Sequence, residues 1–518
     1  MRRDVSEKIS WKILVGFASL ILALAYVVEK EVSLPAPIIL LIALGGGAFL
    51  ILNSLAGPEI PLYVLAAYIP FNYALPGTFG GTLTALNLTN LLCVVVMIGL
   101  LCRSMKRGGF WLKSNLNVPI LLFTLVGGVS LIWGSWAYGV WYLWAVIIPL
   151  KRWLTPLLFY FLTLWVVEDR RILKTVVVIL MISVAVVGLL AVKEHIDIGE
   201  AGSIESERVG GIAGQPNMLA AFFVYYMFLF ASFFLGNARK PRYWLLLIPF
   251  LVCFRGIQVT FSRGGYLAFF AGGLALSFFR SRVLFGVVIF VLVLALLNPV
   301  LLPEGIRYRL LSTFRGVQAS DEEAIKEVAT DISKGEDLPL EGSAQGRLSI
   351  WKGALKIIRD HPWWGTGYGT FGAIIPYYAP ELRGRRMDAH NSYLIIAAEM
   401  GIPALCIFLW VLFLVIWKSY RLYRIAKDPF VKATALGFLA GLFALIVANM
   451  FGSRVDAEEI SGYFWVLAAI IVRGMMFEKS VRPIPVKAAA ETPSRPLKKA
   501  KSLTASLRRL DELKHETT

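Results

Sequence analysis

The sequence predicts an all-α fold, a polytopic membrane helix bundle of about 12–14 spans with a large extracytoplasmic loop subdomain between the late spans. Hydrophobic residues make up 57% of the 518 residues and charged residues only 17%, with a mean hydropathy of +0.68. A soluble protein of this composition could not cover its own surface. Apolar runs of span length recur along the chain, and Lys and Arg gather in every second connection between them.

A membrane-spanning helix needs roughly 20 apolar residues. The sequence contains about fourteen candidates, several of them short: 13–28, 36–56, 60–76, 83–102, 118–133, 154–167, 172–192, 217–235, 243–261, 265–279, 283–302, 391–417, 430–450 and 460–477. The first lacks a small-residue cleavage site and more spans follow it, so we expect an uncleaved first helix.

The distribution of Lys and Arg predicts the orientation. These residues lie at the N-terminus, in 103–113, 170–174, 239–242, 280–282 and 418–432, and after Arg473. With fourteen spans all of these segments fall on one side, which the positive-inside rule makes cytoplasmic. The other connections then face outward: 29–35, 77–82, 134–153, 193–216, 262–264, 303–390 and 451–459.

Charge and cysteine usage argue against two other classes of protein. The net charge of +18 would suit a nucleic-acid-binding protein, but the basic cytoplasmic connections of a membrane protein account for it, and we expect no nucleic-acid partner. Cys93, Cys102, Cys253 and Cys406 lie in or beside apolar runs without paired spacing. They therefore indicate neither a disulfide framework nor a zinc site.

The connections divide the chain into four predicted parts: a transmembrane bundle at 1–302, a periplasmic loop subdomain at 303–390, C-terminal spans at 391–478, and a basic cytoplasmic tail at 479–518 that we expect to be disordered. Segment 134–153 is rich in tryptophan, which favours the depth of the lipid headgroups. We therefore expect this segment to lie along the membrane interface.

The 303–390 connection contains a predicted amphipathic helix. Leu348, Trp351, Leu355 and Ile358 recur at helical spacing, and basic residues occupy the other faces. Such a helix would lie on the bundle or the bilayer, and the Pro- and Gly-rich stretch 362–369 would end it.

The segment 387–394 closes this long polar loop and opens an apolar run, so it places His390 where water meets membrane. An imidazole has an ordinary pKa near working pH and can take and return a proton without large tuning. His390 is the candidate general base, although a histidine at a helix start is often only a satisfied polar residue. Asp388 is a helix cap, an orienter of the imidazole or an alternative base. Asp-x-His without another ligand nearby does not indicate a metal site.

Four stretches share one pattern with a known family. They are Arg208-Val209-Gly210-Gly211 with Gln215-Pro216-Asn217-Met218-Leu219-Ala220; Phe261-Ser262-Arg263-Gly264-Gly265-Tyr266; Gly346-Arg347-Leu348 through Trp351 to His361-Pro362-Trp363-Trp364-Gly365-Thr366-Gly367; and His390-Asn391-Ser392-Tyr393-Leu394 with Ala398-Glu399-Met400-Gly401-Ile402. In this order they resemble the O-antigen ligase and polymerase family of bacterial inner-membrane glycosyltransferases. The span count is slightly high for that family, and the basic tail is an addition to it.

The resemblance implies a donor glycan on undecaprenyl pyrophosphate and transfer to an acceptor hydroxyl of a glycan, lipid or protein at the periplasmic face of the inner membrane. It also implies no metal or other cofactor, a loop histidine as base, and arginines that hold the pyrophosphate. Asn217 and Asn391 lie in the matching motifs as supporting residues.

Arginine is suited to stabilise the negative charge on the leaving phosphates. Its planar guanidinium donates bidentate hydrogen bonds to phosphate and stays charged. Arg208, Arg263 and Arg347 are the candidates, with Lys151 and Arg152 behind them. Each has a simpler explanation. Arg208 could be ordinary loop charge, Arg347 could decorate the amphipathic helix, and the other three could extend to lipid headgroups.

Two charges inside predicted spans require a partner or a wet cavity, because a buried membrane charge is costly alone. Arg255 lies eight residues before Arg263, and Glu399 nine residues after His390, which at about 1.5 Å per residue puts both at a similar depth. We expect Arg255 and Glu399 either to pair or to line the floor of a cavity beneath the site.

The leading function is therefore an O-antigen-ligase-type glycosyltransferase. A repeat-unit polymerase and a protein O-oligosaccharyltransferase are alternatives within the family, because the donor half of the reaction is shared. A membrane transporter of an anion or a lipid-linked sugar is an alternative of another class, but the sequence shows no convincing inverted repeat. A scaffold subunit of an envelope complex would not require His390.

Overall fold

The computed structural model describes residues 10–29, 36–73, 87–107, 109, 111–199, 207–298, 307, 342–382, 388–454 and 456–480. Most of the predicted tail at 479–518 and most of the first half of the predicted loop subdomain at 303–390 lie outside the described residues. The described residues up to Phe477 form one compact unit.

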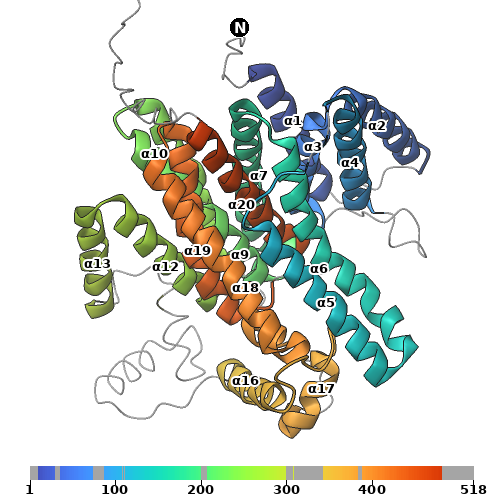
Figure 1. Cartoon of the computed structure of the whole chain (residues 1–518). Helices are drawn as coiled ribbons and strands as arrows, with labels where there is room; N and C mark the ends of the chain where they lie inside the picture. The colour runs from blue at the N-terminus through green and yellow to red at the C-terminus, as the bar shows by residue number, and fades with distance from the viewer. Residues whose placement is uncertain are drawn as a thin grey trace, which may run out of the picture. The chain divides into compact units, whose positions relative to one another are not determined.

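The described residues form helices and their connections, which confirms the predicted all-α class (Figure 1). A helix occupies each predicted span: α1 (Trp11–Glu29), α2 (Ala36–Ala56), α3 (Glu59–Tyr68) with η1 (Ile69–Phe71), α4 (Leu88–Arg107), α5 (Asn117–Tyr138), α6 (Val140–Val166), α7 (Arg170–Ile198), α9 (Pro216–Tyr226) with α10 (Phe228–Asn237), α11 (Leu247–Val259), α12 (Arg263–Arg280), α13 (Arg282–Leu297), α18 (Ser392–Ile425), α19 (Pro429–Ala448) and α20 (Glu458–Ser480). The described connections also contain η2 (Gly211–Ala213), η3 (Pro241–Leu246), η5 (Pro380–Leu382) and η6 (Asn449–Phe451), and the late loop contains α16 (Gly342–Asp360) and α17 (Phe371–Tyr378).

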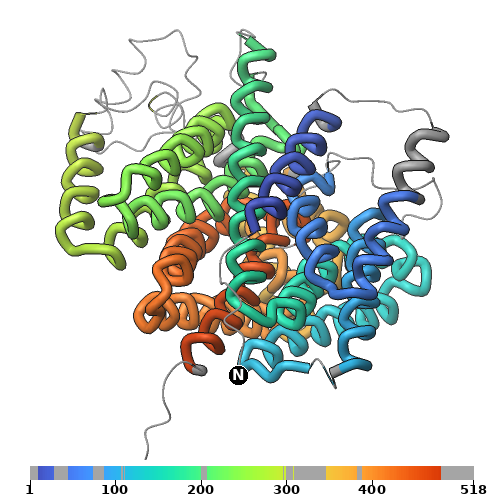
Figure 2. Tube along the Cα trace, turned by 90° about the horizontal axis from the view of Figure 1, so that it is seen from above, coloured from blue at the N-terminus to red at the C-terminus, as the bar shows by residue number. Residues whose placement is uncertain are grey.

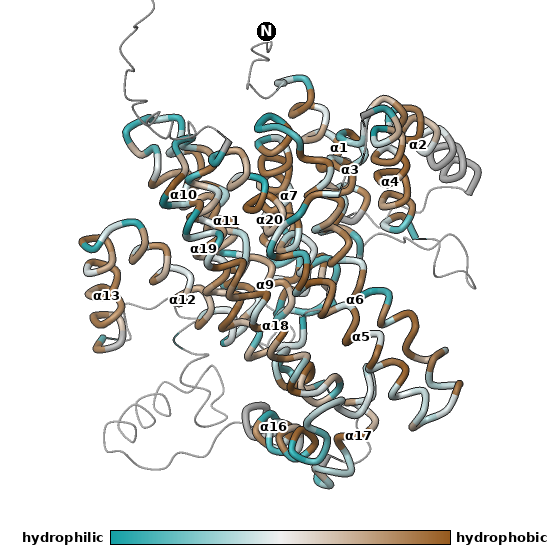
Figure 3. The backbone as a smooth tube through the Cα atoms, viewed as in Figure 1, coloured by the Kyte–Doolittle hydropathy of each residue, from teal (hydrophilic) through white to brown (hydrophobic). Residues whose placement is uncertain are grey.

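Nine helical segments within the described ranges are long and apolar enough to cross a membrane. Four more are apolar but shorter, among them α3 with its 3-10 extension at Glu59–Phe71. Figure 3 shows hydrophobic colouring along most of these helices and hydrophilic colouring at many of their ends and on α16. The chain is therefore a multi-pass membrane protein.

The centre of the bundle consists of α7, α9, α19 and α20, whose side chains are mostly buried within the protein. Helix α12 packs along α19, α18 packs against both α19 and α5, and α7 packs against α1 and α11. Figure 2 shows the bundle from above, with α7 running lengthwise through the middle of the view. The apolar surface left on the outer helices suits contact with lipid rather than water.

Segment 134–153, which we expect at the membrane interface, is part of two consecutive helices. Residues 117–166 form a helical hairpin, in which α5 turns at Gly139 directly into α6. Gly139 has φ +82°, a conformation that favours glycine, so it permits the tight turn. Trp136, Trp141 and Trp144 are exposed near the turn of this hairpin, whereas Trp153 is buried.

Ion pairs join the connections that the positive-inside rule placed on one face. Arg103 Nη1 lies 3.2 Å from Glu59 Oε1 and 3.3 Å from Glu168 Oε2, and Lys174 Nζ lies 2.7 Å from Asp428 Oδ2. These residues come from four connections that the alternation assigns to the same side. The contacts support the predicted alternation, and we call this face the basic end.

The described part of the late loop forms a small layer of its own at the opposite end of α18, where α16 and α17 lie together (Figure 1). The predicted amphipathic helix is present as α16, but its buried face differs from the predicted one. Ile350, Ala354 and Ile357 are buried, whereas Leu348 and Leu355 are exposed. The helix is rotated because its small core packs on α17 and the start of α18 rather than on lipid.

Helix α18 is interrupted at Gly401, which has φ +86°. The loop after α16 bonds to the backbone at this break, with Thr366 N donating to Ala398 O at 2.9 Å and Ile402 N donating to Pro362 O at 2.8 Å. A Cβ at Gly401 would lie 2.2 Å from Trp363 O, so only glycine fits there. Two of the predicted motifs therefore clamp the late loop onto α18.

Candidate functional site

Two short turns at the end of the bundle opposite the basic end share an unusual backbone. His390 has φ +46° and Phe261 has φ +48°, the two positive values of φ recorded for non-glycine residues in the described ranges. Each residue precedes the N-cap of a helix, Asn391 for α18 and Ser262 for α12. A left-handed conformation is costly for such residues and often marks a functional turn.

The imidazole of His390 is paired with a carboxylate. Nδ1 of His390 lies 3.4 Å from Asp388 Oδ2, and both side chains are 42% exposed. This contact favours the expectation that Asp388 orients the imidazole. The helix-cap alternative for Asp388 is wrong, because Asn391 Oδ1 accepts from the backbone N–H groups of Tyr393 and Leu394 and so caps α18.

Three surrounding groups tune the basicity of His390. Burial lowers the pKa of the imidazole, the Asp388 carboxylate raises it, and the Arg347 and Arg454 guanidiniums lower it further. The net result is a pKa below the ordinary value for histidine. His390 is therefore neutral near pH 7, as a general base must be.

Arg208, Asn217 and Ser262 form a hydrogen-bonded knot between the start of α9 and the start of α12. Arg208 Nη2 and Ser262 Oγ both donate to Asn217 Oδ1, at 3.1 and 2.8 Å. Arg208 Nε donates to Thr260 O at 3.0 Å. Two of the predicted motifs thus meet through side chains that are distant in sequence.

Arg454, which the sequence analysis did not identify, connects this knot to the histidine turn. Its backbone N–H donates to Ser392 Oγ at 3.1 Å, and its Nη2 donates to Asn217 O at 3.2 Å. Nη1 also bonds to Ala448 O at the end of α19, and the residue is only 3% exposed. A signal was available, because Arg454 is a basic residue in a connection that the alternation assigns to the outward face.

The turn that carries Arg263 lies beside the same elements. Ser262, directly before it, belongs to the Asn217 knot, and a Cβ at Gly264, directly after it, would lie 2.8 Å from Phe451. The Phe451 ring lies 6.4 Å from that of Trp351, whose Nε1 donates to Ala389 O at 3.1 Å. The neighbours of Arg263 thus connect it to α16, which carries Arg347, and to the histidine turn.

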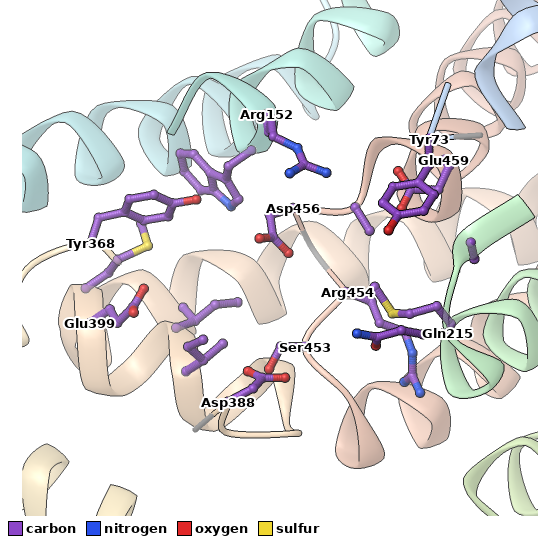
Figure 4. A pocket seen from close by; sticks show the side chains of 17 residues that line it. Tyr73, Arg152, Gln215, Tyr368, Asp388, Glu399, Ser453, Arg454, Asp456 and Glu459 are labelled. Atoms are coloured by element: carbon purple, nitrogen blue, oxygen red, sulfur yellow. The ribbon is translucent and has the colours of Figure 1, made fainter. Parts of the chain in front are cut away.

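A cavity of about 300 Å³ adjoins this cluster, and Asp388 forms part of its wall (Figure 4). Arg152 also lines the cavity and points towards Asp456. The other polar side chains of its lining come from several distant elements: Tyr73, Gln215, Tyr368, Glu399, Ser453, Arg454 and Glu459. The cavity therefore presents carboxylates, hydroxyl groups and two guanidiniums beside the histidine turn.

Lys151 does not share the position of Arg152. Its Nζ lies 3.6 Å from Glu458 Oε1 at the start of α20, and Glu458 Oε2 also accepts from Asn72 Nδ2 at 2.7 Å. Lys151 therefore belongs to a structural polar contact beside the cavity, whereas Arg152 faces the cavity itself.

The predicted pair of Arg255 and Glu399 is wrong. Arg255 Nη2 lies 3.2 Å from Nε2 of His195, on the neighbouring helix α7. Glu399 is buried, and its Oε1 accepts from the backbone N–H of Phe371 at 3.0 Å. The alternative expectation, a place in the cavity wall, is met by Glu399 and not by Arg255. Equal depth did not imply adjacency, because the two helices face different neighbours.

The fold and this arrangement define a class: a multi-pass helical membrane protein with a histidine–carboxylate pair and several arginines gathered at one end of the bundle. Comparison with known proteins sharpens this description. Residues 246–409 match the family model described as O-antigen ligase. Over these residues the match supports the resemblance to the O-antigen ligase and polymerase family that the motifs predict. A search of curated proteins found no match to the chain.

The matched region contains Arg263, Arg347, Asp388 and His390, but the structure completes the cluster from outside it. Arg152, Arg208 and Arg454 belong to segments before and after the match. The match to this family model supports an enzyme of the glycosyltransferase type.

Proposed function

We propose that the protein transfers a glycan from undecaprenyl pyrophosphate to an acceptor hydroxyl at the periplasmic face of the bacterial inner membrane, as an O-antigen ligase does. The observation that carries the proposal is the series of contacts that joins the turn of the His390–Asp388 pair, through Arg454 and Asn217, to Arg208. Repeat-unit polymerisation and transfer to protein hydroxyls use the same donor chemistry.

His390 acts as the general base in this proposal. With Nδ1 directed at Asp388, its Nε2 is left to accept the proton of the attacking hydroxyl. The hydroxyl oxygen forms a bond to the anomeric carbon, and the bond from that carbon to the pyrophosphate oxygen breaks. The lipid pyrophosphate leaves with the electron pair, and the proton remains on the imidazole until water removes it.

The arginines stabilise the negative charge that grows on the leaving group. Arg208, Arg263 and Arg347 are assigned this role because each belongs to an element that meets the histidine turn or the Asn217 knot. Arg454 is a positioning residue. Its guanidinium is buried and donates to the backbone oxygens of Asn217 and Ala448, so it holds the turns in place.

The adjoining cavity suits the sugar portion of a substrate better than a diphosphate. It is lined by the carboxyl groups of Asp388, Glu399, Asp456 and Glu459, which form hydrogen bonds with sugar hydroxyl groups in either protonation state. Tyr368 and Trp153 add aromatic surface to the same lining. We assign the cavity to the glycan and the arginines around His390 to the pyrophosphate.

Transfer and transport are distinguished by reconstituting the protein in liposomes with a radiolabelled lipid-linked glycan and an acceptor, in the presence of EDTA. Wild-type protein should form a new glycosidic bond, and His390→Ala and Arg263→Ala should not, although both variants remain folded. Movement of the labelled lipid without a new glycosidic bond would contradict the proposal and favour a transporter.

A further inference from the structure

A second polar cavity, also about 300 Å³ in volume, lies at the basic end of the bundle. Its wall includes Arg103 on α4, Trp165 and Glu168 at the end of α6, and Arg473 on α20. Arg473 comes 14 residues after Glu459, which lines the first cavity, so along α20 the two cavities are separated by about 21 Å. The second cavity is therefore separate from the proposed glycosyltransferase site.

Arg473 is an unusual residue for the interior of a spanning helix. Arg473 is only 7% exposed, and its Nε has no hydrogen-bond partner among the described residues. Its recorded contact is with the face of Phe477, 5.6 Å from the ring centroid. A buried guanidinium of this kind is costly unless it faces a wet cavity or a ligand of opposite charge.

The charge of the lining favours an anion. Arg103 and Arg473 contribute two guanidiniums, and Glu168 contributes one carboxylate. Arg103 is already held by Glu59 and Glu168 at 3.2 and 3.3 Å and donates to Trp165 O at 2.8 Å. These contacts pair the Arg103 guanidinium with two carboxylates and fix it in the wall, so among the described residues Arg473 is the guanidinium of this wall without a carboxylate at ion-pair distance.

The remaining wall suits the membrane interface. Trp111, which is 55% exposed, lies with its ring centroid 5.6 Å from that of Trp165 and 6.3 Å from that of Phe161. Aromatic rings of this kind sit at headgroup depth, where one side meets lipid and the other meets water. The cavity thus combines two arginines with an aromatic wall of the kind found at headgroup depth.

We propose that this cavity binds a phosphate-bearing anion, either the headgroup of an anionic phospholipid or free phosphate. Arg473 supplies the principal charge, Arg103 forms the second wall, and Trp111 covers the glycerol side of a lipid headgroup. Basic pockets between helices at the cytoplasmic face bind anionic headgroups in this way. A bound lipid would tie α4, α6 and α20 together at the end of the bundle opposite His390.

Thermal unfolding of the purified full chain tests the proposal. Phosphatidylglycerol, phosphatidylcholine and inorganic phosphate are added separately to the wild-type protein in detergent. Phosphatidylglycerol should raise the unfolding midpoint by about 3 °C and phosphatidylcholine should not. An equal rise with inorganic phosphate alone identifies free phosphate as the ligand, and no rise with either anion overturns the proposal.

Arg473→Gln should abolish this rise, and Arg421→Gln, which alters an exposed arginine on α18, should retain it. If Arg473→Gln does not fold, bromine-labelled phosphatidylglycerol provides a second measurement on the wild-type protein. It should quench tryptophan fluorescence at low mole fraction, and Trp111→Ala should reduce the quenching. Equal quenching in Trp111→Ala and wild-type protein would contradict the proposal. His390→Ala should change none of these results, so they do not depend on the proposed transferase activity.

Discussion

The two ends of the bundle use their basic residues differently. At the basic end, Arg103 and Lys174 contact carboxylates within 3.3 Å, so their charges are neutralised within the protein. At the opposite end, Arg208 and Arg454 donate to the carbonyl and amide oxygens of Thr260 and Asn217. A neutral acceptor fixes a guanidinium without cancelling its charge. The comparison indicates that ion pairs hold these helices together at the basic end, whereas hydrogen bonds from guanidiniums to neutral oxygens hold the turns around His390.

The largest expected effect concerns the proposed base. His390→Ala should reduce the rate of glycan transfer by roughly 10²–10⁴-fold, because positioned proton transfer contributes about that much to a reaction. Single-turnover transfer in proteoliposomes measures the change. His361→Ala is the matched control, since it alters an exposed histidine just after α16, and it should transfer at the wild-type rate. Equal losses in the two variants would remove the special role of His390.

A substitution at Arg454 tests whether hydrogen bonds from a guanidinium to uncharged backbone oxygens stabilise the fold. Arg454→Gln should lower the free energy of unfolding by about 2–4 kcal/mol, because it deprives the buried backbone oxygens of Asn217 and Ala448 of a donor. Thermal or denaturant unfolding in detergent measures it. Arg359→Gln, on the exposed face of α16, should change stability by less than about 0.5 kcal/mol. An Arg454→Gln protein as stable as the wild type would show that the knot is not structural.

A substitution at Asp428 tests the ion pairs of the basic end, where its carboxylate contacts Lys174. Burial raises the pKa of its carboxyl, but Lys174, Arg170 and the backbone N–H of Phe430 outweigh burial and lower it. A lowered folded-state pKa contributes stability above the unfolded pKa of about 3.9, and this contribution is lost as the pH falls through the folded value.

Asp428→Asn should therefore cost about 1 kcal/mol of stability at pH 7 and leave the transfer rate unchanged. The difference in stability between wild type and variant should shrink in acid, and unfolding measured from pH 3 to pH 7 checks both statements. A reduced transfer rate in a fully folded Asp428→Asn protein would show that the role of this ion pair is not purely structural.

Much of the fold follows from two local signals, apolar run length and the alternation of Lys and Arg. Both are set by the bilayer rather than by packing, so each predicted span corresponds to a helix. Signals of this kind do not report which helices are neighbours. Arg255 and Glu399 have similar depths but face different helices, and α16 turns a different face to its core because α17 covers it.

The candidate site was predicted only in part for a related reason. His390, Asp388, Arg208 and Asn217 lie in motifs and meet in the structure. Arg454 and the carboxylates of the last outward connection lie in no such motif, and tertiary packing alone brings them to the cavity. The exception that Arg454 makes to the positive-inside pattern is the one sequence signal that would have identified it.

The most direct test of the central claim is the pH dependence of kcat/KM for glycan transfer, whose acid limb reports the pKa of the free base. Asp388 raises and Arg347 lowers the pKa of His390, so Asp388→Asn should move the acid limb to lower pH and Arg347→Gln should move it to higher pH. Opposite shifts of this kind would support His390 as the base within this cluster. An acid limb that stays in place in both variants would contradict the account.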